Sequence, residues 1–521
     1  MNKQLFELYR NSERGKQVIN LFSIKEDTDI RGFVDALIEY AKIWGCDIPI
    51  DMVHNYIPIF CDNAYARGLW AGELTRESWV DFVKQYELII PDYEKDGSVS
   101  FSDDPMAKLI RQGDYRNKAS VIPFQSLFLY CYESGFFKPI LLPLRHDVFL
   151  HNCEALGLEL PPVSSSTKHQ DHCIYYFDLC AAIADFQDEN ELTDEETCAA
   201  IYDFATMFDG DRKQSQELPS PTNVWLTGAS GDDFKYLDTL GNDESAINPT
   251  NIWACNERTR RGDIVVIYAR NPRSYIHSVW RADTAGMFNP FDYYHCRTHV
   301  RDGVKVPPIT YNDLKTDSYF SEIPIVRKNL QGVNGWELTA KDYSELLRMI
   351  EERGGDTSAL PHLFDGSAVD FGTIQNEHDV EENILIPALR RLGYTEADWT
   401  RQLSLKAGRK EKAIPDFVFF ANGEHHFEHA PMVIEAKHDM SSMTEMQNAF
   451  RQGLSYARML RASIMAICDE ERIIVYHIDI NGSSDLNNPV YENHWAKIFS
   501  DETEGAKLKQ IIGREIVYSL L

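Results

Sequence analysis

The sequence predicts a multidomain α+β fold with a mainly helical N-terminal region, a β-barrel in the middle and an α/β domain at the C-terminus. The 521 residues are too many for one ordinary hydrophobic core. Two polar segments with prolines or glycines, at 208–223 and 351–372, have the composition of linkers. Apolar runs of strand length follow the first of them. We therefore expect three domains, over residues 1–208, 222–350 and 373–521.

The composition is that of a globular protein outside the membrane. No run of about 18 apolar residues occurs, and the N-terminus lacks the apolar core of a signal peptide. The ten cysteines form no CxxC pair, which favours free thiols in a reducing compartment. We expect a cytoplasmic protein with no membrane partner. The net charge of −29 predicts weak non-specific binding to nucleic acid, although local basic clusters leave room for phosphate contacts.

The N-terminal 208 residues predict helices but indicate no chemistry. One helix is expected after Thr193, because Thr193 and Glu196 have the spacing of a capping box and precede an apolar stripe.

In the C-terminal region, elements of both kinds alternate. The stretch NEHDVEENILIPALRRLGY predicts a helix that Pro387 kinks and Gly393 ends. The strand-like runs TRQLSL, IPDFVFF and PMVIEAK follow, and then a helix capped by Ser442 and Glu445. SIMAIC and RIIVYHIDI supply two more strands. The order predicts a mixed sheet flanked by helices.

Three charged residues stand inside these strands: Asp416, Glu435 and Lys437. An ion pair within the sheet, or an exposed edge, would explain them without function. Glu435 and Lys437 share a face because they are two residues apart, and an antiparallel neighbour would bring Asp416 close to Glu435. Two carboxylates together require a cation between them, and oxygen ligands in an open site suit Mg²⁺. Such a metal activates water toward a phosphodiester.

A proline–aspartate pair, eighteen residues and then Glu-Ala-Lys resembles the PD-(D/E)xK nuclease superfamily. With the helix before it and QGLSYAR after it, the region from about 375 to 480 is similar to the N-terminal nuclease domain of type I restriction motor subunits. The resemblance implies a restriction-endonuclease-like domain that uses Mg²⁺ or Mn²⁺, with Asp416, Glu435 and Glu377 as metal ligands. It implies the catalytic set Asp416, Glu435, Lys437, Gln452, Tyr456 and either Glu377 or Glu381.

Some of these residues also have simpler explanations. Glu377 and Glu381 lie one turn apart and fit an exposed helix face equally well. Gln452 and Tyr456 could be ordinary helix surface. The chain departs from the motor subunits in one respect: it has no G-x-x-x-x-G-K-[ST] phosphate loop, so we expect no use of ATP.

The middle region contains VWLTGAS, a further tryptophan and RRGDIVVIYARNPRSYIHSVWRAD. This pattern is similar to PUA-like domains of the EVE type, which hold a flipped, often modified base. The resemblance implies base stacking by one of four aromatic residues and phosphate contacts by three arginines. They are Trp225, Trp253, Tyr268 and Trp280, and Arg258, Arg260 and Arg261. Alternatively, the aromatic residues form the core of a barrel.

Together, the resemblances favour a modification-dependent restriction endonuclease of bacterial antiviral defence, acting on double-stranded DNA. Two alternatives stay open: a defence nuclease that a partner or signal activates, with a middle domain that reads RNA or a small ligand, and a non-cutting nucleic-acid reader. The intact acidic and lysine residues argue against the last. A homodimer is expected if both strands are cut, because one such domain holds one site.

Overall fold

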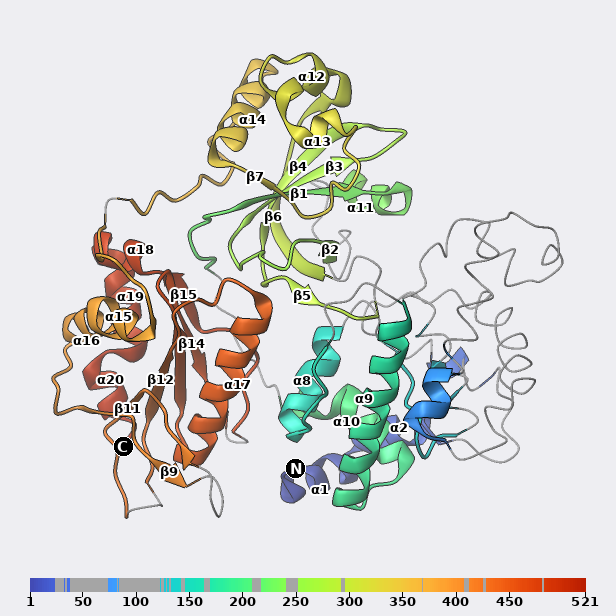
Figure 1. Ribbon diagram of the computed structural model, residues 1–521, viewed down its shortest axis with the longest axis vertical. Helices are drawn as coiled ribbons and strands as arrows, with labels where there is room; N and C mark the ends of the chain where they lie inside the picture. Colours follow the sequence, from blue (N-terminus) through green and yellow to red (C-terminus); the bar gives the residue numbers. More distant parts are fainter. Residues whose placement is uncertain are drawn as a thin grey trace. The chain divides into compact units, whose positions relative to one another are not determined.

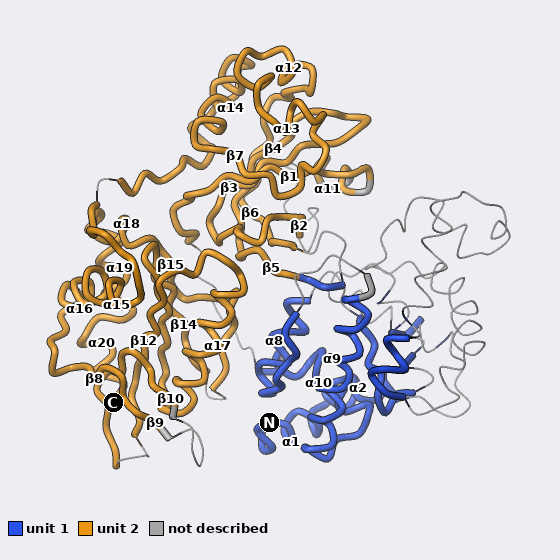
Figure 2. Tube along the Cα trace, in the orientation of Figure 1, with its two compact units in different colours: residues 1–211, 289–295 blue, residues 212–288, 296–521 orange. Residues whose placement is uncertain are grey.

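The computed structural model describes most of the chain outside the N-terminal region (Figure 1). Its continuous described stretches are 1–23, 74–81, 133–141, 146–163, 169–208, 217–239, 252–291, 296–367, 369–406, 412–424, 428–479 and 482–521, with a few isolated residues between them. The chain divides into two compact units (Figure 2). One comprises 1–211 with 289–295, and the other comprises 212–288 with 296–521.

The regular secondary structure among the described residues of the first unit is helical. The helices whose bounds are described are α1 (Lys3–Asn11), α2 (Glu13–Leu21), α8 (His146–Leu156), α9 (His169–Asn190) and α10 (Asp194–Phe208). The capping box expected before α10 is confirmed, because the Glu196 amide donates to Thr193 Oγ1 and the Thr193 amide to Glu196 Oε2. Buried aromatic rings fill its core, and Phe291, from the short excursion 289–295, joins them.

The middle region forms a strongly curled sheet, a half-barrel of seven strands in the order β2-β6-β4-β3-β1-β7, with β5 paired to β6. Its long strand β6 pairs with β5 and β2 near its start and with β4 over the rest of its length, and the register with β4 shifts twice. The curl brings β1 close to β2, because Thr227 Oγ1 donates to the carbonyl of Ala254 over 2.7 Å. The strands are β1 (Val224–Ala229), β2 (Ile252–Ala254), β3 (Ile264–Ala269), β4 (Tyr275–Ala282), β5 (Met287–Phe288), β6 (Cys296–Thr310) and β7 (Trp336–Leu338).

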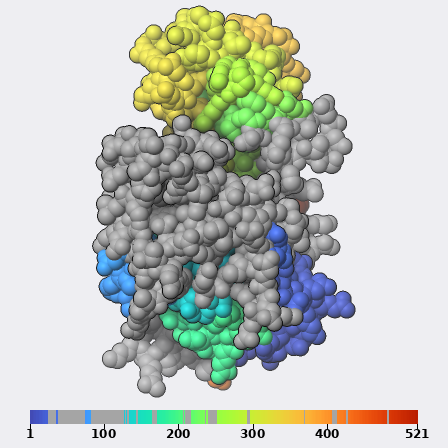
Figure 3. Space-filling model, turned by 90° about the vertical axis from the view of Figure 1, so that its right-hand side faces the viewer, coloured from blue at the N-terminus to red at the C-terminus, as the bar shows by residue number. Residues whose placement is uncertain are grey.

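The two faces of this sheet bury different side chains, as the alternation of a strand requires. The outer face packs against α12 (Tyr311–Thr316), α13 (Pro324–Arg327) and α14 (Ala340–Glu352). These helices form the yellow to orange surface at the top of the space-filling view (Figure 3). The inner face encloses a smaller cluster that includes Trp253, Trp280 and Leu237, the last from α11 (Phe234–Thr239).

The C-terminal region contains a six-stranded mixed sheet in the order β15-β14-β13-β12-β11-β8. Only β12 and β13 are parallel, and helix α17 connects them, so the predicted mixed sheet is confirmed. The strands are β8 (Trp399–Arg401), β11 (Phe417–Phe419), β12 (Met432–Ala436), β13 (Ile464–Cys468), β14 (Arg472–His477) and β15 (Tyr491–His494); β9 (Leu405–Lys406) and β10 (Lys412–Ala413) form a separate hairpin.

Helices cover both faces of this sheet. Helix α17 (Met443–Leu460) starts with the predicted capping box of Ser442 and Glu445 and packs on one face. The other face is covered by α18 (Trp495–Ser500), α19 (Glu502–Ile512), α20 (Arg514–Tyr518) and the helical segment 377–391.

The segment 377–391 differs from the simple kinked helix that the sequence predicts. It consists of α15 (Glu377–Val380), a π-helical turn over 381–385 and α16 (Ile386–Arg391). The amide of Ile386 donates to the carbonyl of Glu381, five residues earlier. Pro387 follows at once, and its missing N–H accounts for a widened turn just before it.

The described cysteines are buried, and none of them is in a disulfide bond. Within the described stretches, no helix is long and apolar enough to cross a membrane.

Candidate active site

Strands β11 and β12 bring Asp416 and Glu435 to the same end of the sheet. The strands pair antiparallel, with Phe417 opposite Ile434, so Asp416 falls opposite Glu435 as the sequence predicts. The carboxylate of Asp416 extends the ladder, because its Oδ2 accepts a hydrogen bond of 2.9 Å from the amide of Ala436. One carboxylate oxygen is therefore tied to the strand that carries the other acidic residue.

Lys437 completes the strand residues of the site. Its Nζ lies 2.7 Å from Oε1 of Glu435, two residues earlier on the same face, and 3.6 Å from Oε2 of Glu377. Glu435 is 1% exposed, and its Oε2 is buried with no hydrogen-bond partner among the described residues. A buried carboxylate oxygen without a partner is costly unless a cation or donor occupies its free side.

The helical segment 377–391 adds two glutamates to the site, and strand β8 adds an arginine. Carboxylate oxygens of Glu377, Glu381 and Asp416 all lie within 4.8 Å of one another. Arg401 donates to Glu381 and, over 2.5 Å, to Oε1 of Glu382. The two glutamates that the sequence offers as alternatives are therefore both present, one beside Lys437 and one held by Arg401.

The crowded acids shift one another's ionisation. The pKa of the Glu435 carboxyl is raised to about 8, first by burial and then by the charge of Asp416, although Lys437 opposes the shift. Burial also raises the pKa of Glu377, although Lys437 lowers it, and burial raises the pKa of Glu381, although Arg401 lowers it. Burial lowers the pKa of Lys437, but the carboxylates of Glu435 and Glu377 raise it more, so this pKa is also above its usual value. A divalent cation would relieve this repulsion between carboxylates.

The donor set fits a hard divalent cation. It consists of grouped carboxylate oxygens from Glu377, Glu381 and Asp416. Oxygen-only sets of this kind suit Mg²⁺ or Mn²⁺ better than metals that prefer nitrogen or sulfur. This group differs from the expected set of Asp416, Glu435 and Glu377, because it contains Glu381 and does not contain Glu435.

Gln452 and Tyr456 lie one turn apart on α17. Nε2 of Gln452 donates to the hydroxyl of Tyr456 over 2.9 Å, and Tyr456 is buried. Neither makes a hydrogen bond to the strand residues Asp416, Glu435 and Lys437 among the described contacts. The structure brings the two residues to each other, and their part in the site stays a prediction.

The four aromatic residues expected to read a base do not form an open pocket. All are buried, with exposed fractions of 1% for Trp225, 5% for Trp253, 6% for Tyr268 and 3% for Trp280. Tyr268 belongs to the outer-face cluster, whereas Trp253 and Trp280 belong to the inner one. Strand alternation sends these rings to opposite faces, where they pack in the core of the curled sheet, and their stacking on a base stays a prediction.

Two of these rings also have structural hydrogen bonds. Nε1 of Trp225 donates to Oδ2 of the buried Asp263 over 2.8 Å, and Nε1 of Trp280 donates to Oγ of Ser278 over 2.8 Å. The ring of Trp280 also leaves no room for a side chain at position 303, where a Cβ would approach it to 2.6 Å. Packing and satisfied N–H groups account for both tryptophans.

The three arginines expected to contact phosphates differ in exposure. Arg260 and Arg261 are buried, at 5% and 3% exposed, and donate to the backbone carbonyls of Met440 and Glu217. Both guanidinium groups are enclosed by protein, and contacts of these two arginines with DNA phosphates stay a prediction. Arg258 is exposed and forms an ion pair of 3.1 Å with Glu337.

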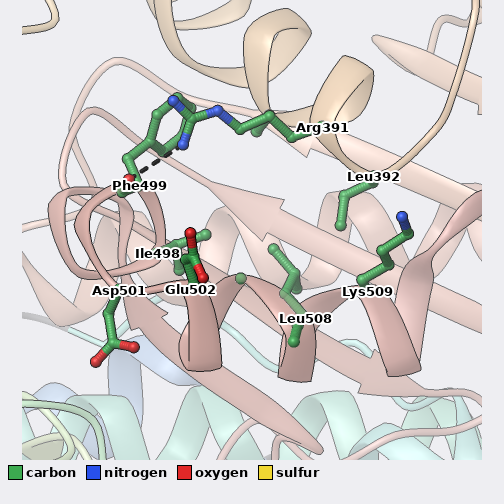
Figure 4. A pocket seen from close by; sticks show the side chains of 11 residues that line it. Arg391, Leu392, Ile498, Phe499, Asp501, Glu502, Leu508 and Lys509 are labelled. Carbon is green, nitrogen blue, oxygen red and sulfur yellow. Dashed lines mark hydrogen bonds between the residues drawn. The ribbon is translucent and has the colours of Figure 1, made fainter.

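A cavity of about 320 Å³ lies apart from the acidic cluster, between α16 and the pair α18–α19. Figure 4 shows Arg391, Phe499 and Lys509 around it, with the guanidinium of Arg391 over the ring of Phe499. None of the residues that line it belongs to the acidic cluster or to β12. The candidate chemistry and the cavity are separate features of this domain.

Sequence reasoning did not find Arg401, which orients Glu381. Its position on β8 opposite Phe417 depends on the strand register, and no motif marks it.

Comparison of the chain with protein-family models, with curated proteins and with solved structures finds no match.

Proposed function

We propose that the chain is a metal-dependent DNA endonuclease whose C-terminal domain, residues 373–521, hydrolyses phosphodiester bonds. The observation that carries the proposal is the meeting of Asp416, Glu435 and Lys437 at the ends of two paired strands, beside two helix glutamates. The resemblance to PD-(D/E)xK nucleases, with its PD and Glu-x-Lys elements on adjacent strands, gives the same assignment.

Each side chain has a role that its contacts support. Glu377, Glu381 and Asp416 would hold Mg²⁺ or Mn²⁺. Oε2 of Glu435, which has no hydrogen-bond partner among the described residues, would also bind a cation. A metal bound there would polarise the phosphodiester and lower the pKa of attacking water. Lys437, fixed by Oε1 of Glu435, is a donor for charge that develops on the phosphate.

The sequence also bears on whether the chain uses ATP. Without a phosphate loop, the chain cuts without hydrolysing ATP. We propose double-stranded DNA as substrate and a homodimer as the active form, because the described part of one chain supplies one acidic cluster and two strands require two cuts.

We further propose that the curled sheet of the middle region, as an EVE-type PUA-like domain, selects modified DNA for a cytoplasmic restriction system of bacterial defence. This assignment rests on the sequence resemblance and on pairing a reader with a cutter. The direct test is cleavage of phage DNA with and without modified bases by the purified chain in Mg²⁺. Cutting of modified DNA alone is the expected result, and equal cutting of both would remove the reader.

A nuclease that a partner or signal activates is the second candidate. The observation that favours it is the burial of Trp225, Trp253, Tyr268 and Trp280, which leaves none of these rings free to stack on a base. Under this candidate, the purified chain would leave all DNA intact until an activating molecule is added.

A further inference from the structure

Arg260 connects the middle region to the segment that follows the Glu-x-Lys strand. It stands in the turn before β3, and its Nη2 donates to the carbonyl oxygen of Met440. Its Nη1 lies 3.8 Å from Sδ of Met446, at the start of α17. Arg260 and its two contacts belong to the same compact unit (Figure 2). The guanidinium therefore reaches from one sheet to the connection between two elements of the other.

This connection is short and fixed at both backbone groups of Met440, three residues after Lys437. The amide of Met440 donates to Oδ2 of Asp469 over 2.9 Å, while Arg260 binds its carbonyl. Asp469 is itself anchored, since its Oδ1 accepts from the amide of Arg472 over 2.9 Å. The amide of Met440 is therefore held by the C-terminal region, and its carbonyl is held by the middle region.

Apolar packing accompanies this contact. Ala285 and Met287, from the middle region, share one hydrophobic cluster with Met440, Met443 and Met446 of the C-terminal domain. Methionine packs adaptably, so such an interface tolerates small shifts that a rigid core would resist.

The guanidinium of Arg260 is buried among other charged groups. Burial lowers its pKa, Arg472 lowers it further, and Asp469 and Glu492 act in the opposite direction. Because removing a charge from water offsets much of what its contacts contribute to stability, a buried ion is weak evidence for a stabilising role. The contacts of Arg260 therefore favour a role in specifying one geometry.

We propose that Arg260 is a positioning residue that couples the middle region to the phosphodiesterase site by fixing the segment 438–442 between Lys437 and α17. The catalytic part of this inference rests on the proposed function. A ligand of the middle region that moves the turn around Arg260 releases the carbonyl of Met440, and the segment next to Lys437 moves with it. The middle region thereby controls cutting without touching the substrate phosphate.

Hydrogen exchange of the full chain tests the contact without relying on catalysis. Arg260→Met keeps the volume and removes the donors, and Arg261→Met is the matched control, because Arg261 is equally buried in the same turn but binds the carbonyl of Glu217. We expect exchange across 438–446 to rise about tenfold or more in Arg260→Met, the loss that one hydrogen bond to a charged group implies, and not in Arg261→Met. Unchanged exchange in Arg260→Met overturns the proposal.

Cleavage kinetics then test the coupling. In Mg²⁺, Arg260→Met should lower kcat with little change in KM, and Arg260→Lys should restore part of kcat. Arg281→Met is the control for activity, because Arg281 donates to the carbonyls of Gly262 and Pro219, and it should match the original chain. Thermal melts of Arg260→Met and Arg281→Met would reveal a general loss of folding. Wild-type kcat in Arg260→Met overturns the coupling. If the original chain cleaves nothing in Mg²⁺, the proposed function fails, and hydrogen exchange alone decides whether Arg260 fixes the segment.

Discussion

Nζ of Lys437 lies 2.7 Å from Oε1 of Glu435, on the same face of β12, while Oε2 of the same carboxylate is buried without a partner. One oxygen is thus satisfied by an ammonium group, whereas the other has no hydrogen-bond partner among the described residues. The proposed chemistry depends on this unequal pairing of the two oxygens of Glu435.

The first prediction concerns Lys437. Lys437→Met should lower cleavage by about 10²- to 10³-fold, the loss seen when one donor to a developing negative charge is removed. Initial rates on plasmid DNA in Mg²⁺ measure it. Lys497→Met is the control, because its ion pair with Asp501 lies on α18 and should contribute little. A Lys437→Met protein that cuts at the original rate would show that the lysine only balances charge.

The second prediction is a pH dependence of stability that comes from Glu435. Its pKa is about 8 in the folded chain against an ordinary value of 4.5, so the folded state keeps a proton that the unfolded state releases. The contribution is therefore complete below about pH 4.5 and is lost as pH rises through about 8. In chelator, the melting temperature of the original chain relative to Glu435→Gln should fall over this window. A constant difference would contradict the assignment.

The third prediction concerns metal binding at the grouped carboxylates. Mg²⁺ or Mn²⁺ should raise the melting temperature of the original chain, with a stabilisation of about 2.7 kcal/mol at a metal concentration of one hundred times Kd. Asp416→Asn and Glu377→Gln should reduce or remove this shift. Glu396→Gln, which alters an exposed ion pair with Arg390 instead, should keep it. Identical shifts in all four proteins would place the metal elsewhere.

The fourth prediction separates the barrel core from DNA recognition. Trp225→Phe removes the hydrogen bond to the buried Asp263 and should destabilise the chain by about 1 to 3 kcal/mol. Urea unfolding measures this loss, and DNA affinity at a temperature where the variant is folded should stay unchanged. Weaker DNA binding without a loss of stability would restore the stacking role.

The sequence predicts much of the C-terminal domain because its signals are local. Strand runs, the capping box of Ser442 and Glu445, and the spacing of Glu435 and Lys437 all act within a few residues. Asp416 is expected near Glu435 only if their strands pair antiparallel, and they do. The contribution of Arg401 to Glu381 could not be foreseen, because it depends on which residue of a third strand lies next to Phe417.

The middle region shows what such reasoning cannot decide. A tryptophan in a strand reads the same whether it lines a pocket or fills a core, since both require an aromatic ring on one face. The two faces of the sheet separate Tyr268 from Trp253 and Trp280, and only the folded strand order reveals this. Likewise, the cluster of Arg258, Arg260 and Arg261 looks like one basic patch in sequence, although only the first is exposed.

To decide whether the acidic residues cut DNA, phage DNA is incubated with the purified chain in Mg²⁺ without ATP, and in parallel with Asp416→Asn at equal concentration. The oxygen of Asp416 that binds the Ala436 amide is retained in the variant, so the strand pairing should persist while the carboxylate charge is lost. We expect endonucleolytic fragments with the original chain, none with chelator and none with a folded Asp416→Asn protein. Equal cleavage by both proteins would show that Asp416 is not part of the catalytic site.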